Sequence, residues 1–440
     1  MLTMAAQKAD SPRRWASESL LLGVSAAFLV VNFLALDLLR PGLNRLSHWL
    51  PLVLWGTCAV VGKRLLDRKL PGHDPVIFPL AMFLSGWGLV LIERLAPNFA
   101  DRQILWLVLS VGAMLLAAAL PHLLRWLRNY RYSLLVAGLG LLAGTIVLGT
   151  NPSGQAGAPE LWLGFGPIFV QPSEILKIIL AAFLASYLAE QYPAMRAAGL
   201  ASEGRRLGLS PRVVGPVLLM WGLSVVILVW QRDLGTAALF FVVFLVLLYI
   251  ASGHSLILVS GGLLLLIAGI IAYREFSVVR LRVDIWLNPW PEADARAFQI
   301  VQSLLAFAAG GIFGQGVGQG SPVYIPVVHS DFVFAALAEE WGLLGIVAAL
   351  VCILALFTRG LRIGIQQQGR PFQALLAVGL STLLAAQSLL ITGGVLKVLP
   401  LTGVTLPFMS YGGSSLLASF IIVGLLLRLS TPEANHAVHP

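Results

Sequence analysis

The organisation of this chain is decided by residues 323–345, VYIPVVHSDFVFAALAEEWGLLG, where a long polar loop ends and an apolar run begins. The triplet 329–331, His-Ser-Asp, lies at the junction, and Glu339 and Glu340 follow about two turns into the apolar run. A charged side chain in hydrocarbon costs at least about 2.5–3.5 kcal/mol, so such acids are expected to face a polar cavity or a partner. The structural alternative is that the triplet only caps the following helix and complements its N-terminus.

Apolar stretches of about 18 residues recur along the whole chain, which has 440 residues, 58% of them hydrophobic and 11% charged. The stretches are continuous and do not alternate, which excludes a transmembrane β-barrel. The sequence therefore predicts an all-α polytopic membrane protein with about twelve transmembrane helices. The predicted spans cover residues 19–39, 48–61, 75–93, 103–120, 132–149, 173–191, 213–230, 233–251, 255–273, 332–357, 372–393 and 406–427.

Basic residues are concentrated in alternate connections between these spans. If the N-terminus is cytoplasmic, 18 of the 29 Lys and Arg residues fall in inside loops and tails. This bias predicts cytoplasmic N- and C-termini, and it explains the net charge of +9 without nucleic-acid binding. The two cysteines, Cys58 and Cys352, both lie in apolar runs and form neither a disulfide framework nor a zinc-binding spacing.

Two of the predicted outside connections are long, residues 150–171 and 274–330. In the second, Ala306–Ile312 is apolar but too short to span, so a re-entrant or interfacial helix is expected. The following GGIFGQGVGQG, residues 310–320, predicts a mobile backbone with free N–H groups; no strand precedes it, which argues against a nucleotide-binding motif. A connection as long as 274–330 is usually functional.

The first polar motif is QPSEILK, residues 171–177, at the outer start of the sixth predicted span. Pro172 suits the first turn of a helix. Glu174 and Lys177 are three residues apart, so they share a helical face and can pair. The spacing is compatible with a structural ion pair and with a catalytic pair.

Two further motifs lie at the same predicted level. In QRDLGTA, residues 231–237, Asp233 is placed to cap the next helix, and a structural role is favoured. In LPLTGVTLPFMSYGGSS, residues 399–415, Pro400 and Pro407 interrupt the last apolar segment. Broken helices at membrane depth are tolerated where they line a cavity, which suits a transporter as well as an enzyme.

With these four motifs in order, the sequence resembles the shape, elongation, division and sporulation (SEDS) family of RodA and FtsW proteins over about residues 75–430. The resemblance implies a SEDS-like catalytic membrane domain of ten spans over 73–430, with a large extracellular loop, 274–330, before the tenth span of the whole chain. A tail and two extra spans, residues 1–72, precede this domain, and a cytoplasmic tail, 431–440, follows it.

The resemblance also implies an activity, that of a peptidoglycan glycosyltransferase for cell shape or division. Such an enzyme polymerises lipid II, a disaccharide-pentapeptide carried on undecaprenyl diphosphate, at the outer face of the bacterial cytoplasmic membrane. Asp331 matches the family's essential acid, and Glu174 and Lys177 match the acid and base of the first motif. The sequence departs from the family pattern at Arg232 and Ser330, among other positions, but keeps all three of these residues.

This chemistry suits the residue types. A sugar hydroxyl must lose a proton as it attacks, and a carboxylate such as Asp331 can act as the general base. The diphosphate leaving group requires cations. The candidate cations are Lys177, Arg280, Arg282 and Arg296. The other candidate substrate-binding residues are Asp233, Gln299, His329, Ser410, Gly412, Gly413 and Ser414.

No cofactor is certain, although a divalent cation, Mg or Mn, could share the diphosphate; the sequence shows no dedicated metal site. The resemblance implies a partner, a class B penicillin-binding protein with transpeptidase activity and one membrane span. Its contact is expected on the small residues of 379–394, unless these pack within the bundle. Two alternative functions are a flippase or transporter for lipid-linked precursor and a scaffold for a cell-wall synthase. The acids gather at the outer face, which argues against a transporter with a midplane site.

Overall fold

The computed structural model describes residues 11–39, 45–151, 160–166, 168–201 and 233–431, with a few isolated positions between 215 and 230. Within this part of the chain, eleven helices are long and apolar enough to cross a membrane, which confirms the helical polytopic class. The predicted span 213–230 and the tails lie outside the described residues, apart from those isolated positions and the start of the first helix.

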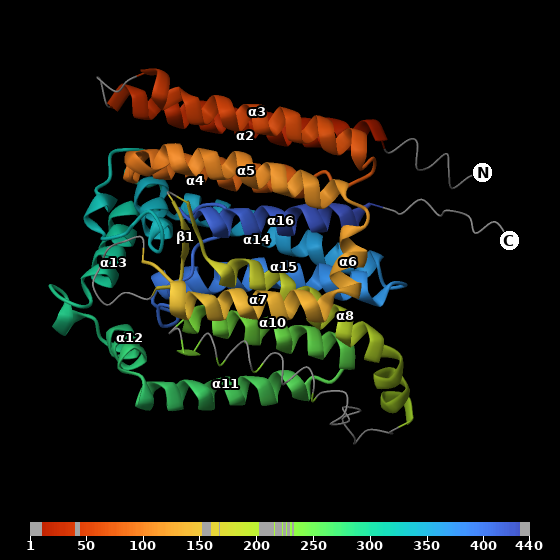
Figure 1. Ribbon diagram of the computed structural model, residues 1–440. Coiled ribbons are helices and arrows are strands. Elements are labelled where there is room, and N and C mark those ends of the chain that lie inside the picture. The colour runs from red at the N-terminus through yellow and green to blue at the C-terminus, as the bar shows by residue number, and fades with distance from the viewer. Residues whose placement is uncertain are drawn as a thin grey trace.

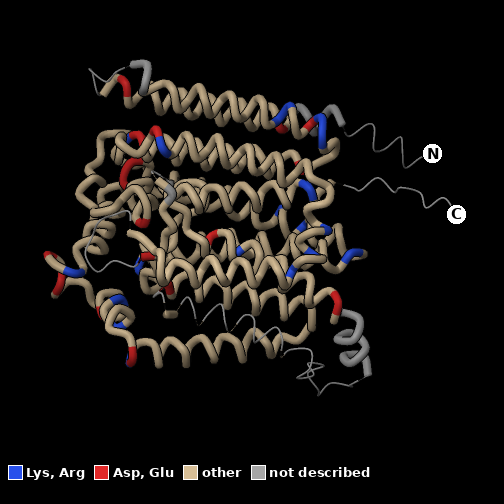
Figure 2. Tube along the Cα trace, in the orientation of Figure 1, with Lys and Arg blue, Asp and Glu red and all other residues tan. Residues whose placement is uncertain are grey.

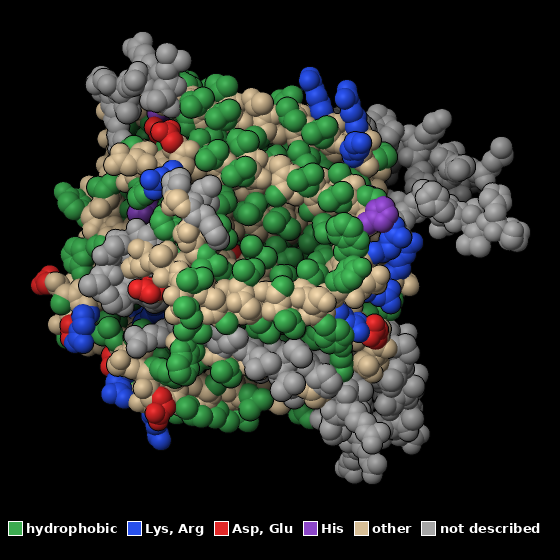
Figure 3. Space-filling model, viewed as in Figure 1, with side chains coloured by type: hydrophobic (Ala, Val, Ile, Leu, Met, Phe, Trp, Pro, Cys, Tyr) green, Lys and Arg blue, Asp and Glu red, His purple; other side chains and the backbone are tan. Residues whose placement is uncertain are grey.

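The membrane-length helices run side by side (Figure 1). They are α2 (Ser11–Leu39), α3 (Arg45–Lys69), α4 (Ile77–Leu95), α5 (Ala100–Ala119), α7 (Arg131–Leu148), α8 (Pro172–Ala201), α10 (Leu234–Ser252), α11 (Leu256–Glu275), α14 (Val333–Gln366), α15 (Pro371–Val395) and α16 (Gly413–Ser430). The shorter elements are η1 (Pro97–Phe99), α6 (Leu123–Asn129), the antiparallel strands β1 (Leu163–Phe165) and β2 (Ile168–Val170), α12 (Ser277–Leu287), η2 (Trp290–Glu292), α13 (Phe298–Gly310) and η3 (Pro322–Tyr324). Apolar side chains cover the middle of the face in Figure 3, and charged side chains lie mainly toward its two ends.

The two N-terminal helices form the outermost layer on one side, where α2 packs on α4 and α3 packs on α5 (Figure 1). At one end of this layer, His48 Nδ1 lies 3.1 Å from Glu93 Oε1. In its middle, Trp55 Nε1 donates to the Met82 carbonyl at 2.9 Å. Polar contacts along its length therefore fasten this hairpin to the rest of the bundle.

The bundle core is built from α4, α8, α15 and α16, which are mostly buried, whereas α11 is exposed along most of its length. The small residues of α15 serve this packing: Gly379, Ser381 and Ser388 are buried, and Gly360 of α14 lies directly against Ser381. The segment 379–394 therefore packs within the bundle, and the expected partner contact on it is wrong. Small residues allow close helix approach in either setting, so composition alone could not decide.

The connection 274–330 is largely ordered into α12, α13 and short turns, and the expected short helix is present but begins at Phe298. The prediction that the N–H groups of the glycine-rich segment are free is wrong at Gln315 and Gly316. The α14 backbone leaves helical geometry at Gly342 (φ 65°), and the segment supplies the missing hydrogen bonds. Gln315 N and Gly316 N donate to the carbonyls of Glu339 and Glu340, at 2.8 and 3.0 Å. In return, N–H groups just beyond the break, at Leu343 and Leu344, donate to the carbonyls of Gly311 and Ile312.

Candidate active site

The non-helical segment 399–412 is the common wall of the site. The expected last span is shorter than predicted, because α16 begins only at Gly413. Ser410 is held in this wall: its Oγ donates to the Ser330 carbonyl at 2.6 Å and accepts from Leu406 N at 2.9 Å. Tyr411 N donates to the His329 carbonyl at 2.8 Å. The wall is thereby joined to the His-Ser-Asp junction, 80 residues earlier in the sequence.

A chain of polar contacts joins the same wall to the first motif. Glu174 and Lys177 form the ion pair that their spacing predicts, with 2.6 Å between Oε2 and Nζ. Lys177 Nζ also donates to Gln387 Oε1 at 2.7 Å, and Gln387 Nε2 donates to the Thr405 carbonyl at 2.8 Å. Both members of the pair are buried, so the lysine charge is held in place by two oxygen partners.

Asp233 caps α10, as its place in the second motif predicts, with Oδ1 accepting from Thr236 N at 3.1 Å. Its Oδ2 is buried without a hydrogen-bond partner in the described part of the chain. Burial raises the pKa of Asp233, and the Glu174 carboxylate raises it further, while the Thr236 bonds and Lys177 act in the opposite direction. Asp233 therefore caps α10 and also interacts electrostatically with the Glu174–Lys177 pair of the first motif.

Asp331 lies in the turn immediately before α14, and burial raises its pKa. The Ser330 side chain and the Arg282 guanidinium favour its charged form and act in the opposite direction. Arg282, from α12, donates to the Thr402 carbonyl at 3.3 Å. Burial lowers the pKa of Arg282, and both Asp331 and Asp233 counteract that effect. The half-buried Arg282 thus interacts electrostatically with both Asp331 and Asp233, which are about 100 residues apart in the sequence.

The structure does not bring every predicted residue to this cluster. Arg280 is exposed, and its guanidinium donates to the carbonyls of Tyr273 and Arg274. Arg296 is exposed and pairs with Glu292. Gln299 is half-buried and donates to the Pro326 carbonyl, outside the wall. The remaining predicted residues form or adjoin the wall. His329 stacks on Phe99, Ser414 accepts from Gln171 N, Gly413 lies against the Trp106 ring, and Gly412 precedes α16.

Sequence reasoning missed two residues that organise this end of the molecule. Gln387 was detectable as a lone amide inside an apolar run, and it connects Lys177 to the wall. Arg94, expected in an outside loop, is instead buried at the end of α4 and pairs with Glu340 at 3.1 Å. Its other donors reach the carbonyls of Gly318 and Gly320, so it fixes the glycine-rich segment.

The expected divalent cation has no cluster of ligand residues at the candidate site among the described residues. Within the described residues, three side chains, Glu18, Asp67 and His73, have potential ligand atoms close enough together to hold an ion. They lie at the opposite end of the molecule, and Lys63 Nζ is already 2.7 Å from Asp67 Oδ2.

Comparison with known proteins identifies the family of this chain. Residues 76–435 match the family model of the FtsW, RodA and SpoVE proteins, described as cell cycle protein. The chain belongs to this family. It is 37% identical to the peptidoglycan glycosyltransferase RodA of Mycobacterium tuberculosis, covering 95% of this chain and 91% of that protein. It is 33% identical to the probable peptidoglycan glycosyltransferase FtsW of Tolumonas auensis, covering 84% and 95%.

Solved structures of SEDS-family proteins share the fold. RodA of Thermus thermophilus matches with a TM-score of 0.58 and 26% identity, over 82% of this chain and 97% of that one. A chain from a peptidoglycan synthase complex, solved to show how polymerisation and crosslinking are coordinated, matches with a TM-score of 0.66 and 27% identity, over 82% and 98%. The family model begins seven residues after α3 ends, so the α2–α3 hairpin precedes the part of this SEDS chain that the model matches.

Proposed function

We propose that this SEDS protein is a peptidoglycan glycosyltransferase that polymerises lipid II, with Asp331 as its general base. The observation that carries the proposal is the convergence of all four motifs on one wall, which brings Asp331, Arg282, Asp233 and the Glu174–Lys177 pair into one electrostatic unit. Burial holds the Asp331 pKa above its ordinary value, toward the range in which a carboxylate accepts and releases protons efficiently.

In the proposed reaction, a hydroxyl oxygen of the acceptor sugar attacks the anomeric carbon of the donor. The bond between that carbon and the diphosphate oxygen breaks, and undecaprenyl diphosphate leaves with the bonding electrons. Asp331 takes the proton of the attacking hydroxyl. Arg282 and Lys177 are the cations that the structure places in this unit, so they are assigned to the diphosphate. A divalent cation, Mg or Mn, would add positive charge that offsets the charge of the leaving diphosphate.

The experiment that tests this function is a polymerisation assay with purified protein and lipid II. Glycan polymer that is lost on Asp331→Asn supports the assignment. Transport of lipid II across liposome membranes without polymer formation would instead support the flippase alternative. Neither activity, from protein that remains folded, would favour a scaffold.

The proposed orientation places the site at the outer face of the cytoplasmic membrane and both termini in the cytoplasm. Basic residues gather at the end where α3 and α16 terminate, opposite the site (Figure 2), in line with the positive-inside rule. In a variant without the two native cysteines, a cysteine at exposed Ser321 should react with an impermeant reagent in intact cells, and one at exposed Gln368 should not. The reverse pattern would invert the orientation. Ser202, in the predicted inside loop between the sixth and seventh spans, lies outside the described residues.

The proposed partner is a transpeptidase of the class B penicillin-binding type, because strands must be crosslinked as they form. Support comes from the matched chain that was solved within a peptidoglycan synthase complex. The partner's outer stalk is assigned to the 274–330 connection, which reaches Asp331 directly. Equal polymerisation rates with and without the co-purified transpeptidase would remove activation through this connection.

A further inference from the structure

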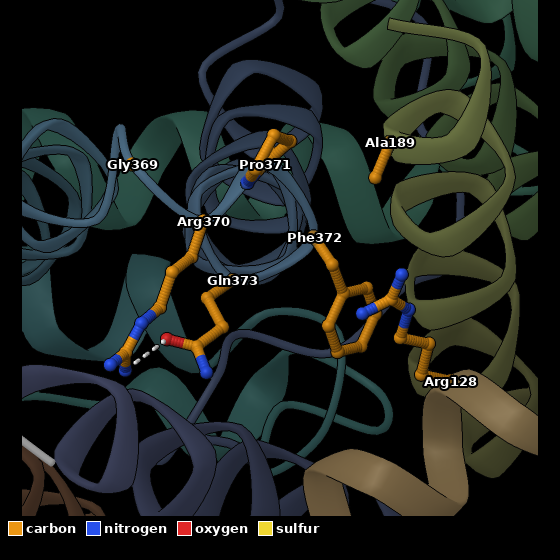
Figure 4. A pocket seen from close by; sticks show the side chains of 7 residues that line it. All are labelled: Arg128, Ala189, Gly369, Arg370, Pro371, Phe372 and Gln373. Atoms are coloured by element: carbon orange, nitrogen blue, oxygen red, sulfur yellow. Dashed lines mark hydrogen bonds between the residues drawn. The ribbon is translucent and has the colours of Figure 1, made fainter. Parts of the chain in front are cut away.

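A polar pocket lies at the end of the molecule opposite the candidate site, where α6, α8 and the start of α15 meet (Figure 4). Its volume is about 310 Å³. Ala189, Pro371 and Phe372 give it an apolar wall. The pocket lies on α8 and α15, the two helices that carry Lys177 and Gln387 at their other ends.

The charged side chains that line this pocket are two arginines, Arg128 and Arg370, with no acid among the lining residues. Arg370 donates to the Gln373 side chain at 3.5 Å (Figure 4). In the described part of the chain, no hydrogen bond or ion pair occupies the Arg128 guanidinium. Glu190, next to the lining residue of α8, pairs with Arg131 at 2.7 Å and interacts only electrostatically, without a hydrogen bond, with Arg128. The pocket therefore carries net positive charge, to which the first N–H groups of α15 add.

The surroundings place this pocket at the level of lipid headgroups. Leu124 and Leu127 of α6 are buried against the bundle, while Trp126 and Tyr130 are exposed beside them. Exposed Trp and Tyr side chains of membrane proteins concentrate at the interface between hydrocarbon and water. A pocket with an apolar wall and two cations at this level can take a group that is charged at one end and apolar at the other.

We propose that this pocket binds the phosphate group of an anionic phospholipid from the leaflet at this end of the molecule. Basic pockets between membrane helices are known to accept such headgroups. Guanidinium groups suit phosphate because their paired N–H donors match its oxygens. The apolar wall at Phe372 accommodates the glycerol and upper acyl chain. The site is independent of the polymerisation chemistry, which takes place at the opposite end.

The test measures phosphatidylglycerol bound to the full-length protein in nanodiscs of phosphatidylcholine with increasing phosphatidylglycerol, by native mass spectrometry. Arg128→Gln and Arg370→Gln should each weaken binding about tenfold, as expected for loss of a charge-assisted hydrogen bond. The matched control is Arg125→Gln, which removes the same charge from an exposed position on the same helix outside the pocket. Its effect should be several-fold smaller.

A variant that keeps both arginines distinguishes lipid binding in the pocket from general attraction of anionic lipid to the basic surface. A Cβ added at Gly369 would meet no atom within 4 Å, so Gly369→Leu should fold, narrow the pocket and weaken binding with both arginines present. Equal effects of Arg125→Gln and Arg128→Gln, or unchanged binding in Gly369→Leu, would overturn the proposal. Displacement of the lipid by millimolar inorganic phosphate or glycerol 3-phosphate would show that the site serves a soluble phosphate instead, which also overturns the lipid assignment.

Discussion

Two buried ion pairs lie at the same end of this molecule as the candidate site, and they differ in what surrounds them. Glu174 and Lys177 pair at 2.6 Å within one helix, and the lysine continues to Gln387. Arg94 and Glu340 pair at 3.1 Å across 246 residues, and the arginine continues to backbone carbonyls of the glycine-rich segment. The first pair influences another titratable group, Asp233, whereas the second fixes a loop.

The comparison shows that burial of an ion pair does not by itself identify a catalytic group. Burying two charges has a large desolvation cost in both cases. In the first pair the charges act on one neighbouring acid, Asp233, which is useful for chemistry. In the second pair, the Arg94 guanidinium also donates to the backbone carbonyls of Gly318 and Gly320, which holds the glycine-rich segment in place. The neighbours of a pair decide its role, and the following experiments test that distinction.

The largest expected effect is that of Asp331→Asn, which removes the acid that interacts with Arg282. Loss of a general base should lower the polymerisation rate about 10²–10⁴-fold with the protein still folded. The control is Glu339→Gln, since Glu339 Oε1 only accepts a hydrogen bond from Ser321 N and an amide oxygen can do the same. Near-native activity of a folded Asp331→Asn protein would refute the base assignment.

The effects of changing Glu174 and Lys177 on polymerisation should be strongly coupled. Glu174→Gln and Lys177→Met are each expected to lower polymerisation about 10–100-fold, because either change leaves the other charge buried with one partner fewer. The double variant should lose less than the sum of the two losses, with a coupling energy of about 0.5–3 kcal/mol. Strictly additive losses would show that the two side chains act separately.

The second pair should affect stability more than chemistry. Arg94→Met or Glu340→Gln alone should lower the free energy of unfolding by about 3–5 kcal/mol, because each strands a buried partner. The double variant should recover part of that loss. Polymerisation per folded molecule should change only a few-fold, measured beside unfolding in the same detergent. If the Arg94 and Glu340 variants lost as much polymerisation per folded molecule as the Glu174 and Lys177 variants, the two pairs would not differ in role.

The smallest expected effect is a shift in pH dependence. The Arg282 charge counteracts the burial that raises the Asp331 pKa, so Arg282→Gln should raise this pKa further. The base then becomes protonated at higher pH, and the acid limb of the rate profile should move upward by about one pH unit. Arg280→Gln, two residues away on the same helix and exposed, is the matched control and should leave the limb in place. An unchanged acid limb in Arg282→Gln would show that Arg282 does not influence the pKa of Asp331.

The parts of this molecule that sequence could predict are those with local signals. Continuous apolar runs predicted the described spans, and the three-residue spacing of Glu174 and Lys177 predicted their pair. Arg94 was misplaced because it ends an apolar run beside polar residues, while its partner is 246 residues away. The break at Gly342 also had no local signal, since no proline marks it and its hydrogen bonds come from another segment.

That break has a mechanical consequence. On the N-terminal side of Gly342, the nine residues Val333–Trp341 form a short helix that begins two residues after Asp331. The longer remainder of α14 follows Gly342. Four backbone hydrogen bonds that would have stiffened the junction are made with residues 311–316 instead. Asp331 thus lies at the start of a short helix whose junction with the rest of α14 is hydrogen-bonded to residues 311–316. A force applied to residues 311–316 would therefore move Asp331 without tilting the rest of α14.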